Sequence, residues 1–387
     1  MSIDAGFRPE GTCMQIQRFW LLDNLRGLAS LSVVLFHYKH FFYSAPGVLS
    51  PTFNNSEQPF YFILSPLYDF GFDAVQLFFT LSGFVFFFVY YQSLGDGKVT
   101  GREFVIARFS RLYPLHFVTL LFVACGQYLS WRSTGQFFVY PFNDAFHFLL
   151  NVLFISGWGF QRGDSFNGPI WSVSIEIALY MLFFLYAKLF RIRSSRDLAM
   201  AIVTWLILLP VWRLAPQTIS LFAHSALCFF IGGIAFLAWK RCATCKRALQ
   251  IKLFFASLAW SAFGLVWFAV GEYRSALDFI AFPALVLSLA IAQSMFVDAG
   301  KRTCIIGDIS YSTYLLHFPL QLLIVLVGQH IGAEIDFNRP SLFLSFLAAL
   351  FICSACTYYY FERPIQFYLR ARLSPGRTRA SFLKKSA

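Results

Sequence analysis

The sequence predicts an all-α, polytopic membrane protein with about ten transmembrane helices and with both termini in the cytoplasm. Of its 387 residues, 58% are apolar and 13% are charged, whereas soluble domains carry about 25% charged residues. Its mean hydropathy is +0.61. A water-soluble protein of this length has no core large enough for 50 Phe, 18 Tyr and 9 Trp. These observations exclude an ordinary soluble domain.

The number of spans follows from the length of the apolar runs. A helix needs about 20 apolar residues to cross a bilayer. Ten runs approach this length: 19–43, 71–92, 112–131, 170–190, 198–215, 219–239, 253–270, 277–297, 308–330 and 342–361. A further run, 145–158, contains His147 and Asn151 and is too short to span comfortably. We interpret it as re-entrant or interfacial.

The 31 lysines and arginines support this count. With the N-terminus inside, most of them fall in inner segments, as the positive-inside rule requires. The distribution of these positive charges therefore indicates how the protein is oriented in the membrane. It also accounts for the net charge of +12, and we expect no nucleic-acid partner. We predict a cytoplasmic N-terminal segment (1–18), a membrane domain (19–364) and a basic cytoplasmic tail (365–387) that is disordered and faces anionic lipid.

The first apolar run contains an arginine and a histidine eleven residues apart, Arg26 and His37. In an α-helix this spacing returns to within roughly 20° of the same face and rises about 16 Å. Arg26 would lie near the inner surface, where Asp23 is placed to pair with it at i, i+3. The alternative for Arg26 is a side chain that snorkels to the interface. His37 lies deeper, and His40, one turn later, is expected at the outer interface.

A buried carboxylate matches His37 in depth. Glu176 lies six residues into the run 170–190, which enters from the same outer side. A carboxylate next to an imidazole fixes its tautomer and stabilises the imidazolium, which prepares a general base. We therefore predict a contact between His37 and Glu176, although depth alone leaves the order of the helices open.

Four further residues are candidates, each with a structural alternative. Asp73 lies at the outer mouth of the second span, where the helix dipole also favours a carboxylate; Gly71, Ser82 and Gly83 nearby allow close helix approach. Arg108 and Arg111 share one helical face at the inner surface and are suited to phosphate, or are ordinary inner charges. His317 lies near mid-membrane before Pro319, and a hydrogen-bonded packing role is the alternative.

The cysteines do not indicate a metal. Cys242 and Cys245 form a lone C-x-x-C, and no second pair lies at the spacing of a structural zinc site. We expect no metal cofactor.

Several of these segments resemble one known family, in chain order. LDNLRGLASLSVVLFH (22–37) resembles the Arg-x10-His signature of the membrane acyltransferase 3 family, and RFSRLYP (108–114) resembles its Arg-x-x-Arg loop. GFDAVQLFFTLSGF (71–84), WSVSIEIALY (171–180), ISYSTYLLHFP (309–319) and FERP (361–364) are similar to its other motifs. One departure is Asn24, where the family often has glycine.

The resemblance implies an integral membrane O-acyltransferase of the plasma (bacterial inner) membrane. Such an enzyme moves an acyl group, usually acetyl from acetyl-CoA, to a hydroxyl of an extracytoplasmic carbohydrate such as exopolysaccharide or lipopolysaccharide. Arg26, Arg108 and Arg111 would bind the CoA co-substrate, and His37 would be the essential histidine. The expected partners are acyl-CoA, a glycan or lipid-linked glycan acceptor, the lipid bilayer and glycan-assembly proteins. Members often carry an additional SGNH-type domain, and we expect the stand-alone form here.

Other interpretations stay open on the residues alone. His37, assisted by Glu176, either deprotonates the acceptor hydroxyl or forms a covalent acyl-histidine. Buried Glu176, His317 and His37 would also suit proton relay in a transporter or a flippase for a lipid-linked sugar. A non-catalytic scaffold for glycan assembly is the third alternative.

Overall fold

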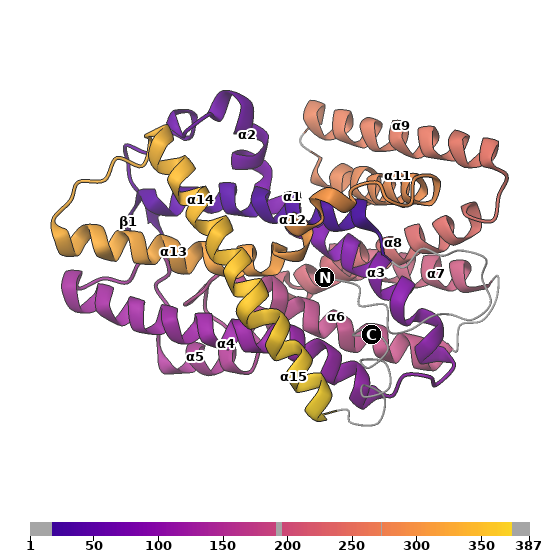
Figure 1. Ribbon diagram of the computed structural model, residues 1–387, viewed down its shortest axis with the longest axis horizontal. Coiled ribbons are helices and arrows are strands. Elements are labelled where there is room, and N and C mark those ends of the chain that lie inside the picture. The colour runs from indigo at the N-terminus through magenta and orange to yellow at the C-terminus, as the bar shows by residue number, and fades with distance from the viewer. Residues whose placement is uncertain (1–17, 191–195, 272, 374–387) are drawn as a thin grey trace. The chain divides into compact units, whose positions relative to one another are not determined.

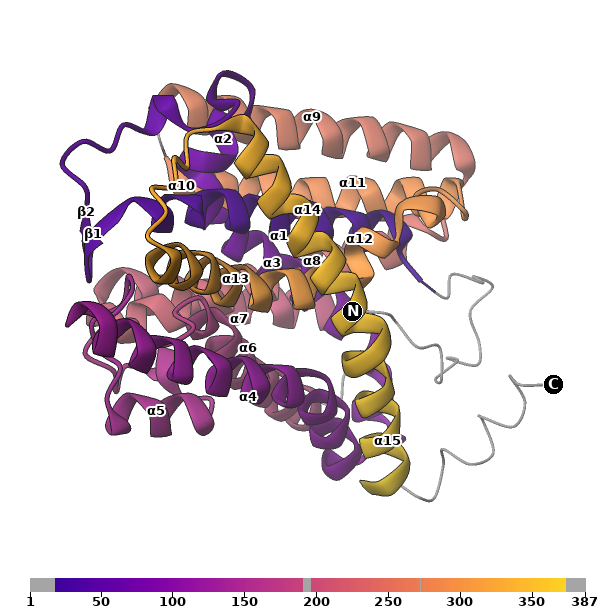
Figure 2. The same ribbon diagram turned by 60° about the vertical axis from the view of Figure 1, so that its left-hand side comes forward.

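The computed structural model describes residues 18–190, 196–271 and 273–373 (Figures 1 and 2). Within these ranges helices dominate, and the strands form one short antiparallel hairpin, β1 (Tyr43–Ala45) and β2 (Val48–Leu49). The predicted all-α fold class is therefore confirmed. The chain forms two compact units, which are described separately below.

Unit 1 comprises Met1–Ala29, Asp73–Gly101 and Glu176–Asp308. Its elements are the first part of α1 (Trp20–Phe36), α3 (Ala74–Gly95), most of α6 (Ile170–Phe190), α7 (Arg196–Leu214), α8 (Gln217–Cys242), α9 (Arg247–Gly271), α10 (Arg274–Ala276), the π-helical η5 (Leu277–Ala281), α11 (Phe282–Met295), η6 (Lys301–Thr303) and α12 (Ile305–Asp308). Figures 1 and 2 both show α9 running alongside α11, which it contacts.

Glycines allow α3 and α8 to pack backbone against backbone. A Cβ at Gly83 would lie 1.8 Å from the carbonyl oxygen of Phe229, and one at Gly232 would lie 1.9 Å from that of Thr80. Any side chain would therefore force the helices apart. Close helix approach is how membrane helices gain packing energy without a hydrophobic driving force, and the prediction for Gly83 is confirmed.

Phenylalanines fill the interior of unit 1. The ring of Phe19 meets those of Phe84, Phe88 and Trp239 edge to face, with centroids 5.0–5.2 Å apart. Edge-to-face pairs are the favoured aromatic geometry. The Trp239 Nε1–H donates to the Ala290 carbonyl at 3.1 Å, so its polar end is satisfied within the unit.

Unit 2 comprises Ser30–Phe72, Arg102–Ile175 and Ile309–Ala387. Its elements are the end of α1, the 3₁₀ helix η1 (His37–Phe42), the hairpin, η2 (Asn55–Glu57), α2 (Tyr61–Phe70), the start of η3 (Gly71–Asp73), α4 (Gly101–Thr134), α5 (Ala145–Val152), η4 (Ser156–Trp158), the start of α6, α13 (Ser310–Ile331), α14 (Pro340–Thr357), the π-helical η7 (Tyr358–Glu362) and α15 (Arg363–Leu373).

Two apolar clusters hold unit 2 together. The first packs the end of α1 and η1 against α2 and α14 and contains Val34, Leu35, Tyr38, Phe41, Tyr68, Phe343, Phe346 and Leu350. The second packs α4 and the following loop against α13 and contains Leu120, Val123, Val139, Tyr140, Phe166, Phe318 and Leu322. Because η1 contributes Tyr38 and Phe41 to the first cluster and also contacts α13, its position is set by packing on several helices.

Nine helical segments among the described residues are long and apolar enough to cross a membrane, and they include nine of the ten predicted runs. The remaining predicted run is the first one, 19–43, which begins with α1. This helix ends at Phe36 after 17 residues. The chain then continues as η1, so the predicted regular helix to residue 43 is wrong from His37 onward. α5 has eight residues, far fewer than a span needs.

The predicted terminal segments are only partly described. Residues 1–17 and 374–387 lie outside the described residues, and the orientation of the termini stays a prediction. The segment 365–387, expected to be disordered, begins as helix, because α15 extends from Arg363 to Leu373.

Candidate active site

His37 is the first residue of η1, where the backbone leaves the regular helix. The residue is partly exposed, whereas His317, from α13, is fully buried. The two rings stack with centroids 5.1 Å apart and planes 13° apart. The Gln321 side-chain Nε2–H donates to the His37 carbonyl at 2.9 Å. A packed helix therefore holds both the backbone and the ring of His37.

The hydrogen bonds of His317 define the tautomer of both rings. Nδ1 of His317 lies 2.6 Å from the Tyr314 carbonyl oxygen. A carbonyl only accepts, so this nitrogen carries the hydrogen, and Nε2 of a neutral His317 is an acceptor. That Nε2 lies 3.2 Å from Nδ1 of His37. Nδ1 of His37 is therefore the donor, and its Nε2 keeps the lone pair that a general base or nucleophile requires.

His40 is a neighbour of this pair. Its ring stacks on that of His37 at 4.7 Å, and its Nδ1 lies 3.1 Å from the Gln321 Oε1. Its Nε2 lies 3.4 Å from the Tyr140 hydroxyl. His40 is 3% exposed, so its ring is buried within unit 2, and its interfacial depth stays a prediction. His40 supports η1.

Pro319 frees a carbonyl on α13, and a side chain satisfies it. Proline has no N–H to donate to the carbonyl four residues earlier, which is that of Leu315. The Asn167 Nδ2–H donates to the Leu315 oxygen at 3.0 Å. α13 continues through Pro319 to Ile331. The segment before α6 thus stabilises the helix that carries His317.

The predicted i, i+3 pair in α1 is present in unit 1. Arg26 donates to Asp23 at 2.9 Å, and Arg18 bonds both Asp23 and Asp308 at 2.5 Å. Arg26 is 7% exposed, which excludes the snorkelling alternative. Asn24, the departure from the family pattern, donates to the Gly300 carbonyl at 3.0 Å and so ties α1 to the turn before η6.

The predicted arginine pair in unit 2 has a third guanidinium nearby. Arg108 and Arg111 lie on α4, and Arg111 is 9% exposed. Arg370, on α15, lies 3.4 Å from both the Ala107 carbonyl and the Ser110 hydroxyl, in the same turn of α4. Clustered guanidiniums are suited to phosphate oxygens.

Glu176 accepts a hydrogen bond from the Ser82 hydroxyl at 2.5 Å, within unit 1. Because His37 belongs to unit 2, the predicted contact between His37 and Glu176 stays a prediction. Within its own unit, the Nδ1 of His37 has His317 as its partner.

Two other buried polar residues have structural partners. Asp73 forms an ion pair with Arg274 at 3.2 Å. His147 bonds Asp144 through Nδ1 at 2.7 Å and accepts the backbone N–H of Arg162 through Nε2 at 3.2 Å. The N–H groups of His147 also lower the pKa of the Asp144 carboxyl, which caps α5. We assign His147 a structural role.

The sequence placed His317 within the membrane but did not connect it to His37. A usable signal is present: His317 and Gln321 are four residues apart and therefore lie on one face of a helix. Gln321 bonds the His37 carbonyl and the His40 ring. Arg370 gave no such signal, because it stood among other basic residues of the tail.

Comparison with known proteins defines the class. Residues 19–359 match the acyltransferase domain family Acyl_transf_3, and the chain belongs to this family. It is therefore a membrane acyltransferase.

Two relatives are similar to this chain. Protein 2 in the picA locus of Rhizobium radiobacter is 36% identical over 28% of this chain and 45% of its own length. Acyltransferase MdmB of Streptomyces mycarofaciens is 24% identical over 77% of this chain and 82% of its own. The chain thus spans less than half of the first relative and about four fifths of the second. No solved structure matches.

Proposed function

We propose that this membrane acyltransferase transfers an acetyl group from acetyl-CoA to a hydroxyl of an extracytoplasmic carbohydrate, such as exopolysaccharide or lipopolysaccharide, at the bacterial inner membrane. The supporting observation is the pair formed by His37 and His317, whose hydrogen bonds leave Nε2 of His37 unprotonated. A neutral, oriented imidazole is what deprotonation of a hydroxyl requires.

The proposed reaction is a direct transfer. Nε2 of His37 removes the hydroxyl proton as the acceptor oxygen attacks the thioester carbonyl carbon. The C–S bond then breaks, and the imidazolium returns the proton to the leaving thiolate. The products are an O-ester and free CoA. His317 accepts the Nδ1–H of His37 throughout and strengthens this bond when His37 becomes positively charged.

The arginines would bind the other end of the co-substrate. CoA carries several phosphate oxygens, and Arg26, Arg108 and Arg111 are the predicted phosphate ligands. Arg370 extends this set in unit 2, because it contacts the same turn of α4. The proposed glycan or lipid-linked glycan acceptor would then enter from outside.

We propose an electrostatic role for Glu176 in the same reaction. The Nδ1 of His37 is engaged by His317, and its Nε2 must stay available to the substrate. A carboxylate can still stabilise the imidazolium through its charge without bonding either nitrogen. Replacing Glu176 by Gln would then lower the transfer rate less than removing His37.

The test uses purified protein in detergent with labelled acetyl-CoA and a carbohydrate extract. We expect acetyl transfer by the wild type and a loss of about 10³-fold in His37→Ala. His330→Ala, an exposed histidine at the far end of α13, is the control and keeps its activity. Normal transfer by His37→Ala would refute the assignment. Binding of no acetyl-CoA by the wild type would favour the transporter or flippase alternative.

The covalent alternative differs from direct transfer in whether CoA is released before or after the acceptor is added. If His37 forms an acyl-histidine, CoA is released in a burst before acceptor is added. Direct transfer releases CoA only with acceptor present. Mass spectrometry of surface glycans from cells with and without the gene then identifies the acyl group and its carrier.

A further inference from the structure

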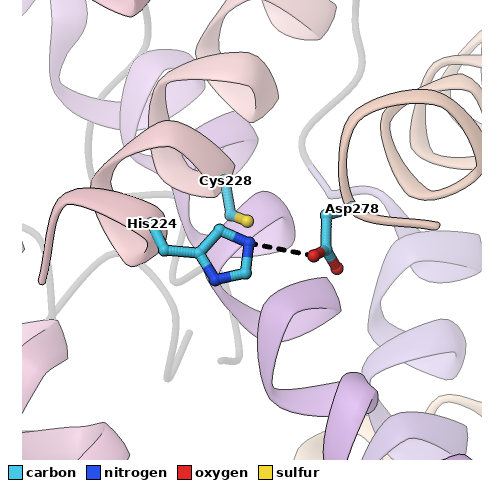
Figure 3. A group of neighbouring side chains, drawn as sticks. All are labelled: His224, Cys228 and Asp278. Atoms are coloured by element: carbon cyan, nitrogen blue, oxygen red, sulfur yellow. Dashed lines mark hydrogen bonds and ion pairs between the residues drawn. The ribbon is translucent and has the colours of Figure 1, made fainter. Parts of the chain in front are cut away.

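A second group of chemically able side chains lies in unit 1 and takes no part in the proposed transfer. His224 and Cys228 are one turn apart on α8, and Asp278 lies in η5 (Figure 3). A ligand atom of each lies within 4.8 Å of those of the other two. We propose that these three residues bind a divalent transition metal of the zinc class, which ties α8 to η5.

The backbone directs the three side chains to one point. Residues four apart on a helix share a face, so His224 and Cys228 project together, as Figure 3 shows. Asp278 faces them from a π-helical turn, a feature that is frequent at functional sites. The Trp212 ring stacks on His224 at 4.8 Å with planes 11° apart and so fixes the plane of the imidazole.

The competing interpretation is an ion pair without metal, because Nε2 of His224 lies 2.9 Å from Oδ2 of Asp278. Two observations favour a metal. The other carboxylate oxygen of Asp278, Oδ1, is buried without a hydrogen-bond partner, and such groups are costly. The Cys228 thiol, also fully buried, lies against this pair, where an ion pair alone gives it no role.

A second carboxylate adds negative charge. Asp73 interacts electrostatically with both His224 and Asp278, and its own Oδ2 is buried without a partner. Arg274 supplies one positive charge to Asp73. Metal binding requires Cys228 to lose its proton. In that state, with neutral His224, the two carboxylates, the thiolate and Arg274 together carry two negative charges. A divalent cation neutralises them, which a low-dielectric interior strongly favours.

The ligand types define the metal class. One thiolate, one imidazole and one carboxylate suit zinc, whereas calcium and magnesium require oxygen ligands. Ligands of tetrahedral zinc lie about 3.5 Å from one another, so small side-chain rotations suffice. Three protein ligands leave a fourth position for water. The expectation of no metal rested on the C-x-x-C spacing of Cys242 and Cys245, a different part of the chain.

The test starts from the wild type. Purified protein is stripped with a chelator, dialysed and titrated with Zn²⁺ or Co²⁺. We expect about one equivalent of metal per chain, a thiolate-to-cobalt charge-transfer band, and a melting temperature that falls on chelation. Affinity should drop at low pH, because the thiol and imidazole must lose their protons to bind.

Matched cysteine variants locate the site. Cys228→Ala should remove the charge-transfer band, weaken binding at least about tenfold and make the melting temperature insensitive to chelator. Cys245→Ser, in the C-x-x-C segment, should behave as the wild type. If Cys228→Ala does not fold, the chelator effect on the wild type still decides. A wild type that binds no metal, or a band lost in Cys245→Ser and kept in Cys228→Ala, overturns the proposal and leaves an ion pair.

Discussion

The two units bury polar groups in different ways. In unit 1 the prominent buried polar groups are charges matched by opposite charges, as in Asp23 with Arg26 and Arg18. In unit 2 the group around His37 is held by uncharged partners: an imidazole, a carboxamide and backbone carbonyls. Ion pairs suppress proton transfer, because each partner stabilises the charged form of the other. Neutral, oriented imidazoles are suited to it.

This difference separates two tasks within one membrane domain. Breaking a buried ion pair leaves an uncompensated charge, so it should mainly reduce stability. Breaking the imidazole chain leaves only neutral groups, so it should mainly reduce the rate of catalysis. The predictions below test this contrast, starting with the largest effect.

Asp23→Asn should destabilise the protein by about 3 kcal/mol, because it leaves Arg26 and Arg18 with less negative charge in a buried site. Asp308 still compensates Arg18. Thermal or denaturant unfolding in detergent measures the change. Lys301, which pairs with Asp298 at an exposed position, gives the control Asp298→Asn, expected within about 0.5 kcal/mol of wild type. Equal effects of the two variants would contradict the contrast.

His317→Leu should lower kcat about 10²-fold, or about 2.7 kcal/mol in activation free energy, with little change in KM for acyl-CoA. The Nδ1–H of His37 loses its imidazole acceptor, so its tautomer and orientation are held less firmly. His317→Gln offers a carboxamide oxygen and should restore part of kcat. Equal losses in both variants, or a change in KM alone, would show that His317 is only a packing residue.

Asn167→Ala should destabilise unit 2 by about 1–2 kcal/mol, because the Leu315 carbonyl loses its donor next to Pro319. The double variant Asn167→Ala with Pro319→Ala should recover stability, since alanine restores the N–H of the helix. Unfolding midpoints of the three variants measure this coupling. No recovery in the double variant would mean that Asn167 acts on another group.

Arg370→Ala should have the smallest effect, about a threefold rise in KM for acyl-CoA at unchanged kcat, as expected for one of several phosphate ligands. High salt should reduce the difference between variant and wild type. The neighbouring Arg372→Ala is the control. A loss of kcat, or an equal effect of both arginines, would contradict a binding role for Arg370.

The sequence by itself determined the class of structure and the local contacts. Within a bilayer each backbone N–H and C=O must be satisfied inside its own segment, so long apolar runs become helices whatever surrounds them. This is why nine of the ten predicted runs lie in candidate spans. The pair Asp23–Arg26 was predictable for a similar reason, since one turn of helix brings the two side chains together.

Only the tertiary structure decided the partners of the buried groups. His37 and His317 are 280 residues apart, Asn167 and Leu315 are 148 apart, and His224 and Asp278 are 54 apart. Depth in a membrane restricts such contacts to a layer, but it does not say which helices are neighbours. That choice depends on side-chain packing, in which glycines such as Gly83 and aromatic rings determine how closely each pair of helices approaches.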